Sequence, residues 1–220
     1  MLDWGRSRTT IRSGTLLHDH PKRNMIAISA PQPPATHRPH RVNEVRVSPP
    51  SGEDHDVMSA AVALDLLRML RGAGIDAWVD GGWGVDALLG EQTRPHADLD
   101  IVLPATHLAR AREVLSGAGF VALREWLPTA LAMRHPDGRE VDLHPVTPTA
   151  DGGGDQELFA PDPPFHYGPP TTGFLDGQGV PCVSAETQLR AHMGYEPQPE
   201  DRADVVALAA RFALPRPEGY

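Results

Sequence analysis

Two aspartates set two residues apart in an apolar segment constrain this chain more than any other feature. The segment reads DLDIVL and begins at Asp98. Side chains of a β-strand alternate between its faces, so Asp98 and Asp100 share one face, while Leu99 and Ile101 point to the core. Two carboxylates this close repel each other unless a cation lies between them, and Mg²⁺ prefers oxygen ligands. The segment therefore predicts a strand with a magnesium site. The alternative is a solvated strand edge that carries two charges.

A second apolar segment, REVDLHPV, carries a lone acid at Asp142. If this segment forms a strand beside the first one, three carboxylates converge on one patch. Three such groups are typical of two-metal sites that catalyse in-line phosphoryl or nucleotidyl transfer. We therefore expect Asp98, Asp100 and Asp142 to bind two Mg²⁺ ions. Asp142 is also the candidate base that removes the proton of an acceptor hydroxyl.

A glycine pair, Gly81-Gly82, precedes the first of these segments. We expect it to form a turn in which the backbone can approach a phosphate closely. The helix expected to start near Trp83 would offer free N–H groups and a positive dipole end to an anion. Arg94 and His96 lie between this helix and the aspartates. They are candidates to bind a nucleotide, with a surface arginine and an ordinary loop histidine as the alternatives.

The pattern of apolar residues predicts an α+β fold, a small mixed β-sheet with helices packed on one face and a helical C-terminal end. The HPDGRE stretch is expected to join two strands as a hairpin, and residues 145–181 are expected to be mainly loop because they are rich in Pro and Gly. The expected helices span 57–72, 83–89, 105–116, 185–194 and 200–212, and the expected strands span 75–80, 98–103, 120–125, 130–134 and 139–144.

The chain divides by composition near residue 57. Residues 1–52 carry a net charge of about +5 and seven prolines, and they show little apolar periodicity. Such a segment buries too little apolar surface to offset its chain entropy. We therefore expect a disordered tail over 1–56, a catalytic domain over 57–214 and a flexible C-terminus over 215–220. A transit peptide and a true translation start at Met58 are alternative explanations of the first segment.

The remaining composition restricts the class of protein. The net charge is −9, which argues against non-specific binding of nucleic acid. No apolar run approaches the roughly 20 residues needed to span a membrane, so no membrane partner is expected. Cys182 is the single cysteine, so the chain has no internal disulfide and fits a reducing cytoplasm. The sequence leaves the oligomeric state open.

Three stretches together resemble a known family: WVDGGWGVDALLGEQTRPHADLDI, VDLHPV and PCVSAETQLRAHMGYEPQPEDRADVVAL. They are similar to the small lincosamide nucleotidyltransferases and, more distantly, to the aminoglycoside 2''-nucleotidyltransferases. Both belong to the DNA polymerase β-like nucleotidyltransferase superfamily. The resemblance covers residues 58–212. The chain departs from the family in its first segment and in the Gly/Pro-rich stretch 151–173.

The resemblance implies the nucleotidyltransferase fold and an activity. Family members transfer a nucleoside monophosphate, usually AMP from ATP, to a hydroxyl of an antibiotic and release pyrophosphate. Asp98 and Asp100 correspond to the paired metal ligands. Asp142 corresponds to the third acid, as ligand or base, and Gly81-Gly82 to the phosphate-binding turn. A lincosamide or an aminoglycoside is then the small-molecule acceptor, and ATP or another nucleoside triphosphate is the co-substrate.

Two other functions remain open at this point. A glycosyltransferase also uses a D-x-D motif with a divalent metal, but it leaves the glycine corner unexplained. A nucleotide-binding module without catalysis is the second alternative, and it predicts binding of ATP and magnesium with no release of pyrophosphate.

Several side chains near these motifs have both a structural and a functional interpretation. Packing is favoured for Trp83, and helix capping or a favourable interaction with the helix dipole is favoured for four residues near the last two helices, His192, Tyr195, Asp201 and Asp204. Packing and a role at the acceptor or metal site are both open for Trp126, His144, Phe165 and Tyr167.

Overall fold

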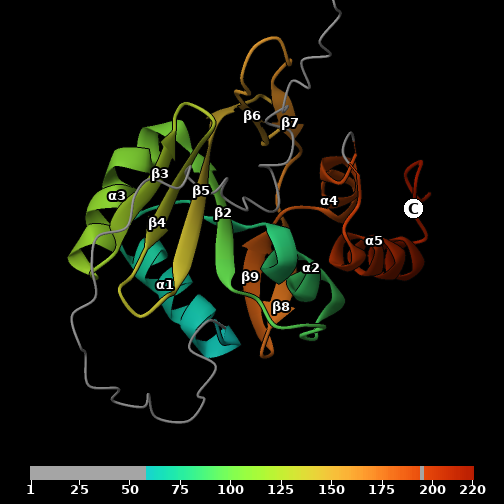
Figure 1. The fold of residues 1–220 in the computed structure, drawn as a ribbon, viewed down its shortest axis with the longest axis horizontal. Coiled ribbons are helices and arrows are strands. Elements are labelled where there is room, and N and C mark those ends of the chain that lie inside the picture. The colour runs from blue at the N-terminus through green and yellow to red at the C-terminus, as the bar shows by residue number, and fades with distance from the viewer. Residues whose placement is uncertain (1–57, 194–195) are drawn as a thin grey trace, which may run out of the picture.

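The computed structural model describes residues 58–193 and 196–220 (Figure 1). The tail expected over 1–56, Gly194 and Tyr195 lie outside the described residues. The helices are α1 (Ala60–Gly72), α2 (Gly81–Leu89), α3 (Leu108–Gly117), α4 (Ala185–Ala191) and α5 (Pro199–Phe212), with a 3₁₀ turn η2 (Ala105–His107) before α3. The strands are β1 (Trp78–Val79), β2 (Asp98–Pro104), β3 (Val121–Trp126), β4 (Ala130–Arg134), β5 (Glu140–Pro148), β6 (Gly154–Gln156), β7 (Phe165–Tyr167), β8 (Thr171–Leu175) and β9 (Gln178–Cys182).

The strands form a mixed sheet, as the sequence predicts. Their order is β3-β4-β5-β2-β1-β9-β8, and β6 pairs with the end of β5 and with β7. The two central strands, β2 and β5, run parallel, whereas β4 and β1 flank them in antiparallel orientation. Because β2 and β5 are parallel, the segment between them must connect the end of β2 with the start of β5 at the opposite end of the sheet. The elements η2, α3, β3 and β4 form this connection.

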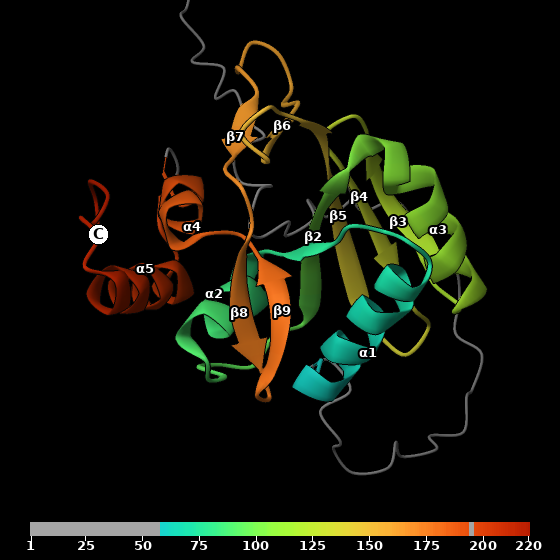
Figure 2. The same ribbon diagram turned by 180° about the vertical axis from the view of Figure 1, so that it is seen from behind.

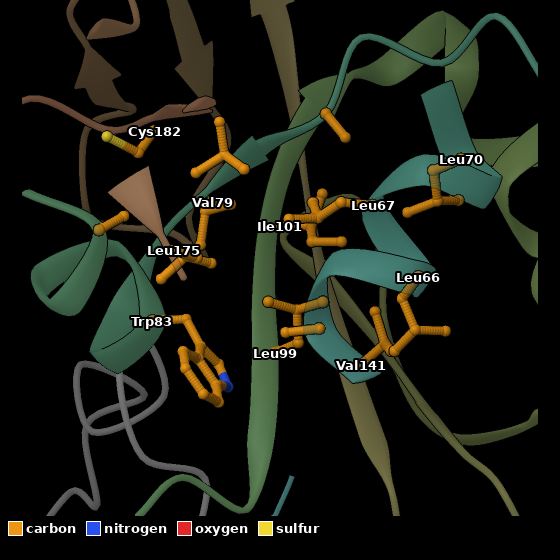
Figure 3. Packing of buried hydrophobic residues seen from close by; sticks show 14 of the residues in the cluster. Leu66, Leu67, Leu70, Val79, Trp83, Leu99, Ile101, Val141, Leu175 and Cys182 are labelled. Atoms are coloured by element: carbon orange, nitrogen blue, oxygen red, sulfur yellow. The ribbon is translucent and has the colours of Figure 1, made fainter. Parts of the chain in front are cut away.

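The main core lies on one face of the central strands. Helix α1 begins after Ser59, whose hydroxyl accepts a hydrogen bond from the Val62 N–H. Its apolar stripe packs against β2 and β5 (Figure 3). The expected inward orientation of Leu99 and Ile101 is confirmed, since both are fully buried in this cluster. Full burial of each such side chain stabilises the fold by about 1.5–3 kcal/mol.

The opposite face of β2 and β5 carries the acids and a smaller apolar cluster. That cluster contains Val102, Val146, Tyr167 and Val183. Tyr167 comes from β7, so the β6–β7 hairpin, at the top of Figure 1, contributes a side chain to this cluster beside the end of β5.

The helices lie in two groups rather than on one face of the sheet. Helices α1 and α3 lie on one side of the molecule (Figure 2), and they contact each other. Helix α2 packs on β8 and β2, and α4 and α5 pack on α2 at the end of the molecule remote from α3. The expectation of helices on one face is therefore correct only for α1 and α3. The C-terminal helices α4 and α5 pack mainly on α2 and on each other.

The expectation of a loop over residues 145–181 is wrong. Strand β5 continues to Pro148, and β6, β7, β8 and β9 follow. These last four strands have three to five residues each, too few for an alternating pattern to stand out among Pro and Gly. A readable signal was present at the turn between β8 and β9. There Asp176 and Gly177 both have positive φ, 46° and 71°, as a two-residue hairpin turn of type I′ requires.

The remaining elements agree with the sequence to within a few residues. The HPDGRE hairpin joins β4 to β5, and the two C-terminal helices are present. The segment 215–220, for which we expect flexibility, contacts the body of the protein. The Tyr220 hydroxyl donates to the His192 carbonyl over 2.8 Å, and the Gly219 carbonyl accepts from Arg202 over 2.6 Å. None of the helices that the structure describes is both long and apolar enough to span a bilayer.

Candidate active site

The structure brings the three predicted carboxylates together on one face of the sheet. Strands β2 and β5 are parallel and in register, and Asp100 lies directly opposite Asp142. Asp98 lies opposite Glu140 one step along the same ladder. The pairing on which the sequence argument depends is therefore present. Because residues two apart share a face, these four acids point away from the main core.

Burial and mutual repulsion oppose ionisation of these groups. Asp100 is 6% exposed and Asp142 is 5% exposed. Burial, followed by the charges of neighbouring carboxylates, raises the pKa of Asp98 to about 6 and that of Asp142 to about 7. Burial also raises the pKa of Asp100 to about 6, although a hydrogen bond from His144 opposes this change. A divalent cation would reverse the effect by screening the charges.

The donor set fits magnesium. Asp142 Oδ1 is buried and has no hydrogen-bond partner among the described residues, so this oxygen is available to a ligand. Within residues 58–193 and 196–220, no group of three Asp, Glu, His or Cys side chains is arranged to hold an ion by itself. Magnesium rarely uses a cage made only of protein; it is usually bound by one or two carboxylates together with substrate phosphates. The face thus provides part of a shell that a bound nucleotide would complete.

The glycine pair lies inside helix α2 and does not form a separate turn before it, so the expected boundary is corrected by two residues. Gly81 has a φ of +56°, a conformation that favours glycine. A Cβ on Gly81 would lie 2.8 Å from Asp100 Cγ, too close for any other residue. The residue before it, Asp80, makes no side-chain cap to the helix within the described part of the chain. The start of α2 therefore has no side-chain cap from Asp80 and lies beside the Asp100 carboxyl group.

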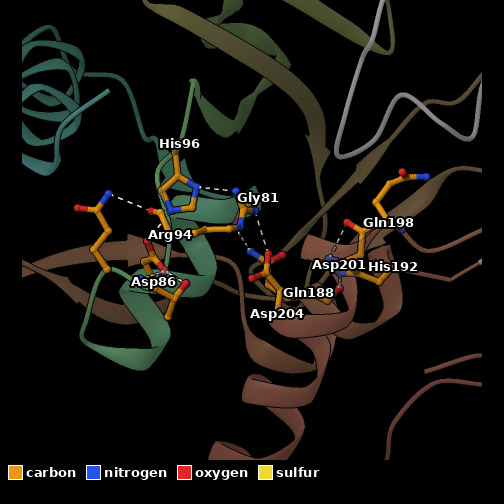
Figure 4. Close-up of polar contacts among 11 residues, drawn as sticks. Gly81, Asp86, Arg94, His96, Gln188, His192, Gln198, Asp201 and Asp204 are labelled. Atoms are coloured by element: carbon orange, nitrogen blue, oxygen red, sulfur yellow. Dashed lines mark hydrogen bonds and ion pairs between the residues drawn. The ribbon is translucent and has the colours of Figure 1, made fainter. Parts of the chain in front are cut away.

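His96 and Arg94 contact each other (Figure 4), and both lie against Gly82. A Cβ on Gly82 would be 2.5 Å from His96 Cε1 and 2.8 Å from an Arg94 nitrogen. His96 Nε2 contacts Asp86 Oδ2 at 2.5 Å, and its Nδ1 contacts the Arg94 guanidinium at 3.0 Å. A guanidinium can only donate, so His96 Nδ1 accepts and Nε2 carries the proton. His96 is 3% exposed, and its hydrogen bond helps to orient the Arg94 guanidinium.

Arg94 is held by the last helix as well. Its second terminal nitrogen donates to Asp204 Oδ2 on α5 over 2.9 Å (Figure 4). The sequence suggests only a helix-terminal role for Asp204, because its partner is 110 residues away in the chain. Burial by itself lowers the pKa of Arg94, but the hydrogen bond and charge of Asp204 raise it above its ordinary value. The guanidinium therefore stays charged beside the glycine end of α2.

Three further polar residues support this region and were missed by sequence reasoning. Asp86 is fully buried and accepts hydrogen bonds from both the backbone N–H and the hydroxyl of Thr93. Gln188 on α4 donates to the Gly81 carbonyl over 3.4 Å (Figure 4). Asp80, also buried, accepts from the Tyr167 hydroxyl over 3.0 Å. An acid inside the apolar stretches WVDGG and GVDALL was the available signal for Asp80 and Asp86.

Three aromatic residues near these motifs pack against other side chains. Tyr167 is buried, and its contact with Asp80 anchors the β6–β7 hairpin to the start of α2. Trp83 packs in the core, with its ring centroid 4.6 Å from that of His96. Phe165 packs beside Tyr167 in the smaller cluster.

Asp201 and His192 have the helix-end roles that the sequence predicts, whereas Asp204 pairs with Arg94. Asp201 forms a capping box with Gln198 at the start of α5. His192 follows α4 and donates from Nδ1 to the Gln188 carbonyl over 2.8 Å (Figure 4). His192 therefore contacts the backbone of Gln188, and Asp201 caps the start of α5.

His144 and Trp126 lie on the acidic face. His144 Nε2 donates to Asp100 Oδ1 over 3.2 Å. Burial alone lowers the pKa of His144, but the hydrogen bond to Asp100 and the surrounding carboxylates raise it to about 9. Trp126 is half-buried at the end of β3, with the Arg124 guanidinium 5.4 Å from its ring centroid. Arg124 also forms an ion pair with Glu140, so this edge of the face carries the Trp126 ring and the Arg124 guanidinium.

Comparisons with known proteins agree with this geometry. Residues 62–208 match the model of the aminoglycoside-2''-adenylyltransferase family. A lincosamide resistance protein from Staphylococcus haemolyticus is 32% identical over 152 residues, covering 66% of this chain and 89% of that relative.

Solved structures are also similar. The lincomycin-bound lincosamide antibiotic adenylyltransferase LnuA superposes with a TM-score of 0.60 at 28% identity, covering 67% of this chain and 94% of that chain. ANT(2'')-Ia in complex with adenylyl-2''-tobramycin shares the fold, with a TM-score of 0.55 at 19% identity over 70% of this chain and 88% of that chain. These matches favour neither a glycosyltransferase nor a binding module. The chain belongs to the aminoglycoside-2''-adenylyltransferase family and is a nucleotidyltransferase.

Proposed function

We propose that this protein transfers AMP from ATP to a hydroxyl group of a lincosamide antibiotic, in a magnesium-dependent reaction that releases pyrophosphate. An aminoglycoside is the second candidate acceptor. The relative from Staphylococcus haemolyticus and LnuA carry lincosamides in their names, which supports the first acceptor. The matching family is named for aminoglycosides, which supports the second.

The observation that carries this proposal is the register of β2 and β5 beside the start of α2. It sets Asp98, Asp100 and Asp142 on one face, next to a helix start whose positive φ and close approach to Asp100 favour glycine. A triphosphate needs cations on its oxygens and N–H donors around them. Both requirements meet where the Asp100 carboxyl approaches Gly81.

Each predicted residue has a role in this proposal. Asp98, Asp100 and Asp142 would hold two Mg²⁺ ions, which would supply positive charge to the phosphates and to the attacking oxygen. The first turn of α2 at Gly81 and Gly82 would bind the triphosphate through its N–H groups. Arg94 would add a charged donor to the phosphates on the side of Gly82. His96 would act on the nucleotide through Arg94, because both of its ring nitrogens are already engaged.

Asp142 is the residue suited to the proton transfer. The acceptor O–H would give its proton to Asp142 Oδ1 as the oxygen attacks the α-phosphorus and the bond to pyrophosphate breaks. That oxygen is buried and lacks a partner among the residues described, so it has no competing hydrogen bond. A base that must also bind a cation can do both through its two oxygens. Asp142 therefore serves as ligand, as base or as both.

The acidic character of the chain favours cationic acceptors. Lincosamides and aminoglycosides carry amines, and a net charge of −9 attracts such molecules over long range. The same charge disfavours nucleic acid as a partner. Because the reaction consumes ATP, we place the enzyme in the cytoplasm. We assign catalysis to the unit formed by residues 57–214.

A screen for pyrophosphate release tests the proposal. The purified full-length protein would be incubated with Mg²⁺ and each of the four ribonucleoside triphosphates, together with a lincosamide, an aminoglycoside or no acceptor. We expect release with ATP and a lincosamide, and the adenylylated product by mass spectrometry. Asp98→Asn and Asp100→Asn should abolish release while the protein stays folded.

Asp176→Asn is the matched control for these two variants. It makes the same chemical change at an exposed acid in the turn between β8 and β9, where asparagine tolerates the positive φ. Near-normal AMP transfer by Asp98→Asn or Asp100→Asn would show that the carboxylates are not the metal ligands. Release without any dependence on acceptor would remove the antibiotic from the proposal.

A further inference from the structure

We propose that Gln156 and His144 are positioning residues that fix the orientation of the Asp100 carboxylate at the metal site. This inference rests on the proposed function, because it takes Asp100 to be a metal ligand. It adds a second element, the β6–β7 hairpin, to the parts of the fold that determine metal binding.

His144 fixes one of the two Asp100 oxygens. The residue lies on β5, opposite Val102 of β2, and its side chain is on the same face as Asp142. Its Nε2 is 3.2 Å from Asp100 Oδ1, and the residue is 1% exposed. Burial excludes water as a substitute donor. The Oδ1 atom of Asp100 therefore has a specific protein partner.

The other Asp100 oxygen points to the nucleotide side. A Cβ built on Gly81 would meet Asp100 Oδ2 before any other atom. The Oδ2 atom thus faces the glycine end of α2, where the proposed function places the triphosphate. Rotation of the carboxyl group about its Cβ–Cγ bond would exchange the two oxygens or take both away from this direction. The hydrogen bond from His144 prevents that rotation.

Gln156 in turn fixes the His144 ring. Gln156 ends β6 and is fully buried. Its Nε2 donates to the Thr129 carbonyl over 2.9 Å and lies 3.2 Å from His144 Nδ1. Strand β6 is itself paired with β5, with Asp155 opposite Thr147. The ring therefore has a partner beside each nitrogen, the Asp100 carboxylate at Nε2 and the Gln156 amide at Nδ1.

An amide suits this position better than other side chains. A glutamine can serve either form of an imidazole ring, because its NH₂ donates to a bare nitrogen and its oxygen accepts from a protonated one. Gln156 Oε1 is buried without a partner in the part of the chain that the structure describes. An orphaned oxygen of this kind is costly, and an apolar residue would avoid the cost. Its presence here argues for a role in orientation rather than in stability.

The expected effects follow from the behaviour of residues that hydrogen-bond to metal ligands. Loss of such a partner costs about 10–100-fold in metal affinity. We expect a loss of this size for His144→Leu. Gln156 is one hydrogen bond further from the ion, so for Gln156→Leu we expect a smaller loss, roughly 3–10-fold. His144→Gln keeps a donor next to Asp100 and should restore part of the affinity lost in His144→Leu.

The test measures Mn²⁺ binding to the full-length protein by electron paramagnetic resonance, in the presence of a non-hydrolysable ATP analogue that completes the shell of the ion, and without acceptor. Circular dichroism and thermal unfolding of each variant show whether it folds. Gln178→Leu is the matched control, since it removes a glutamine amide at an exposed position of β9. In a second measurement, Gln156→Leu should need more Mg²⁺ for pyrophosphate release, while its kcat and its KM for ATP at saturating Mg²⁺ stay close to those of the wild type.

The outcomes separate this inference from the proposed function. If Asp100→Asn loses Mn²⁺ while folded Gln156→Leu and His144→Leu bind it like the wild type, the positioning roles are wrong and the proposed function stands. If those two variants only unfold at lower temperature and keep their Mn²⁺ affinity, their roles are structural and the inference is overturned. If Asp100→Asn keeps full affinity, Asp100 is not a ligand, and the inference falls with the assignment of the metal site. Should His144→Leu fail to fold, Gln156→Leu decides alone.

Discussion

Replacing Asp142 by asparagine should make the metal-free protein more stable while it abolishes catalysis. The pKa of Asp142 rises from its ordinary value of 3.8 to about 7 in the folded protein, chiefly because the carboxyl group is buried. Between these pH values the folded state binds a proton that the unfolded state releases. The contribution of the protonated Asp142 side chain to the free energy of unfolding is fully present below pH 4. It is lost as the pH rises through about 7.

The magnitude follows from the same values. At about 1.4 kcal/mol per pH unit, a rise from 3.8 to about 7 corresponds to an upper limit of about 4 kcal/mol at pH 8. Asp98 and Asp100 share in the repulsion, and the asparagine amide is itself buried, so we expect a net gain of about 1–3 kcal/mol for Asp142→Asn. For a chain of this size the melting temperature would rise by roughly 2–10 °C.

Urea and thermal unfolding in the presence of EDTA, from pH 4.5 to pH 8, measure this gain. We expect the difference between Asp142→Asn and the wild type to be small at pH 4.5 and to grow with pH. Mg²⁺ should stabilise the wild type and not the variant. A gain that is equal at every pH, or a variant that is less stable at pH 8, would refute the account of the site as a set of mutually repelling buried acids.

Three further predictions concern the surroundings of the acids. Gly81→Ala combines a Cβ that would lie 2.8 Å from Asp100 Cγ with a φ of +56°, so it should lose both activity and about 1–3 kcal/mol of stability, measured by pyrophosphate release and urea unfolding. Arg94→Ala removes a cation from the glycine end of α2. It should raise the KM for ATP by about tenfold, with a smaller change in kcat. The control Arg110→Ala, on the exposed surface of α3, should leave the KM unchanged. Tyr167→Phe leaves buried Asp80 without its donor and should lower the free energy of unfolding by about 1–3 kcal/mol; a neutral result would show that another group or water replaces the hydroxyl.

The central part of the fold could be predicted because its signals are local. Alternation of acid and apolar residues fixes the faces of β2, and the hairpin turn between β4 and β5 fixes the neighbour of β5. From these two facts the convergence of Asp98, Asp100 and Asp142 follows once β5 pairs with β2. The ends of α1 and α5 agree with the apolar spacing to within three residues.

The supporting contacts could not be predicted because they join distant parts of the chain. Arg94 meets Asp204 across 110 residues, and Tyr167 meets Asp80 across 87. Such pairs depend on how helices and hairpins pack, which apolar periodicity does not specify. The same limit explains His96. Its position between Trp83 and Asp86 makes it a buried support for Arg94, and nothing in the adjacent sequence distinguishes this from an exposed loop residue.

The parallel pairing of β2 with β5 also determines where the chain can change in length. Residues 105–139 connect the end of β2 to the start of β5. The length of this connection, called the excursion here, does not affect the alignment of the acids, which the direct pairing of β2 with β5 sets. A foreign peptide grafted between exposed Pro136 and Asp137 should leave the reactive face intact. One residue added between Asp98 and Asp100 would put the two carboxylates on opposite faces of β2. Length variation among natural and engineered forms of this enzyme should therefore concentrate in the excursion and be absent from the two strands that carry the chemistry.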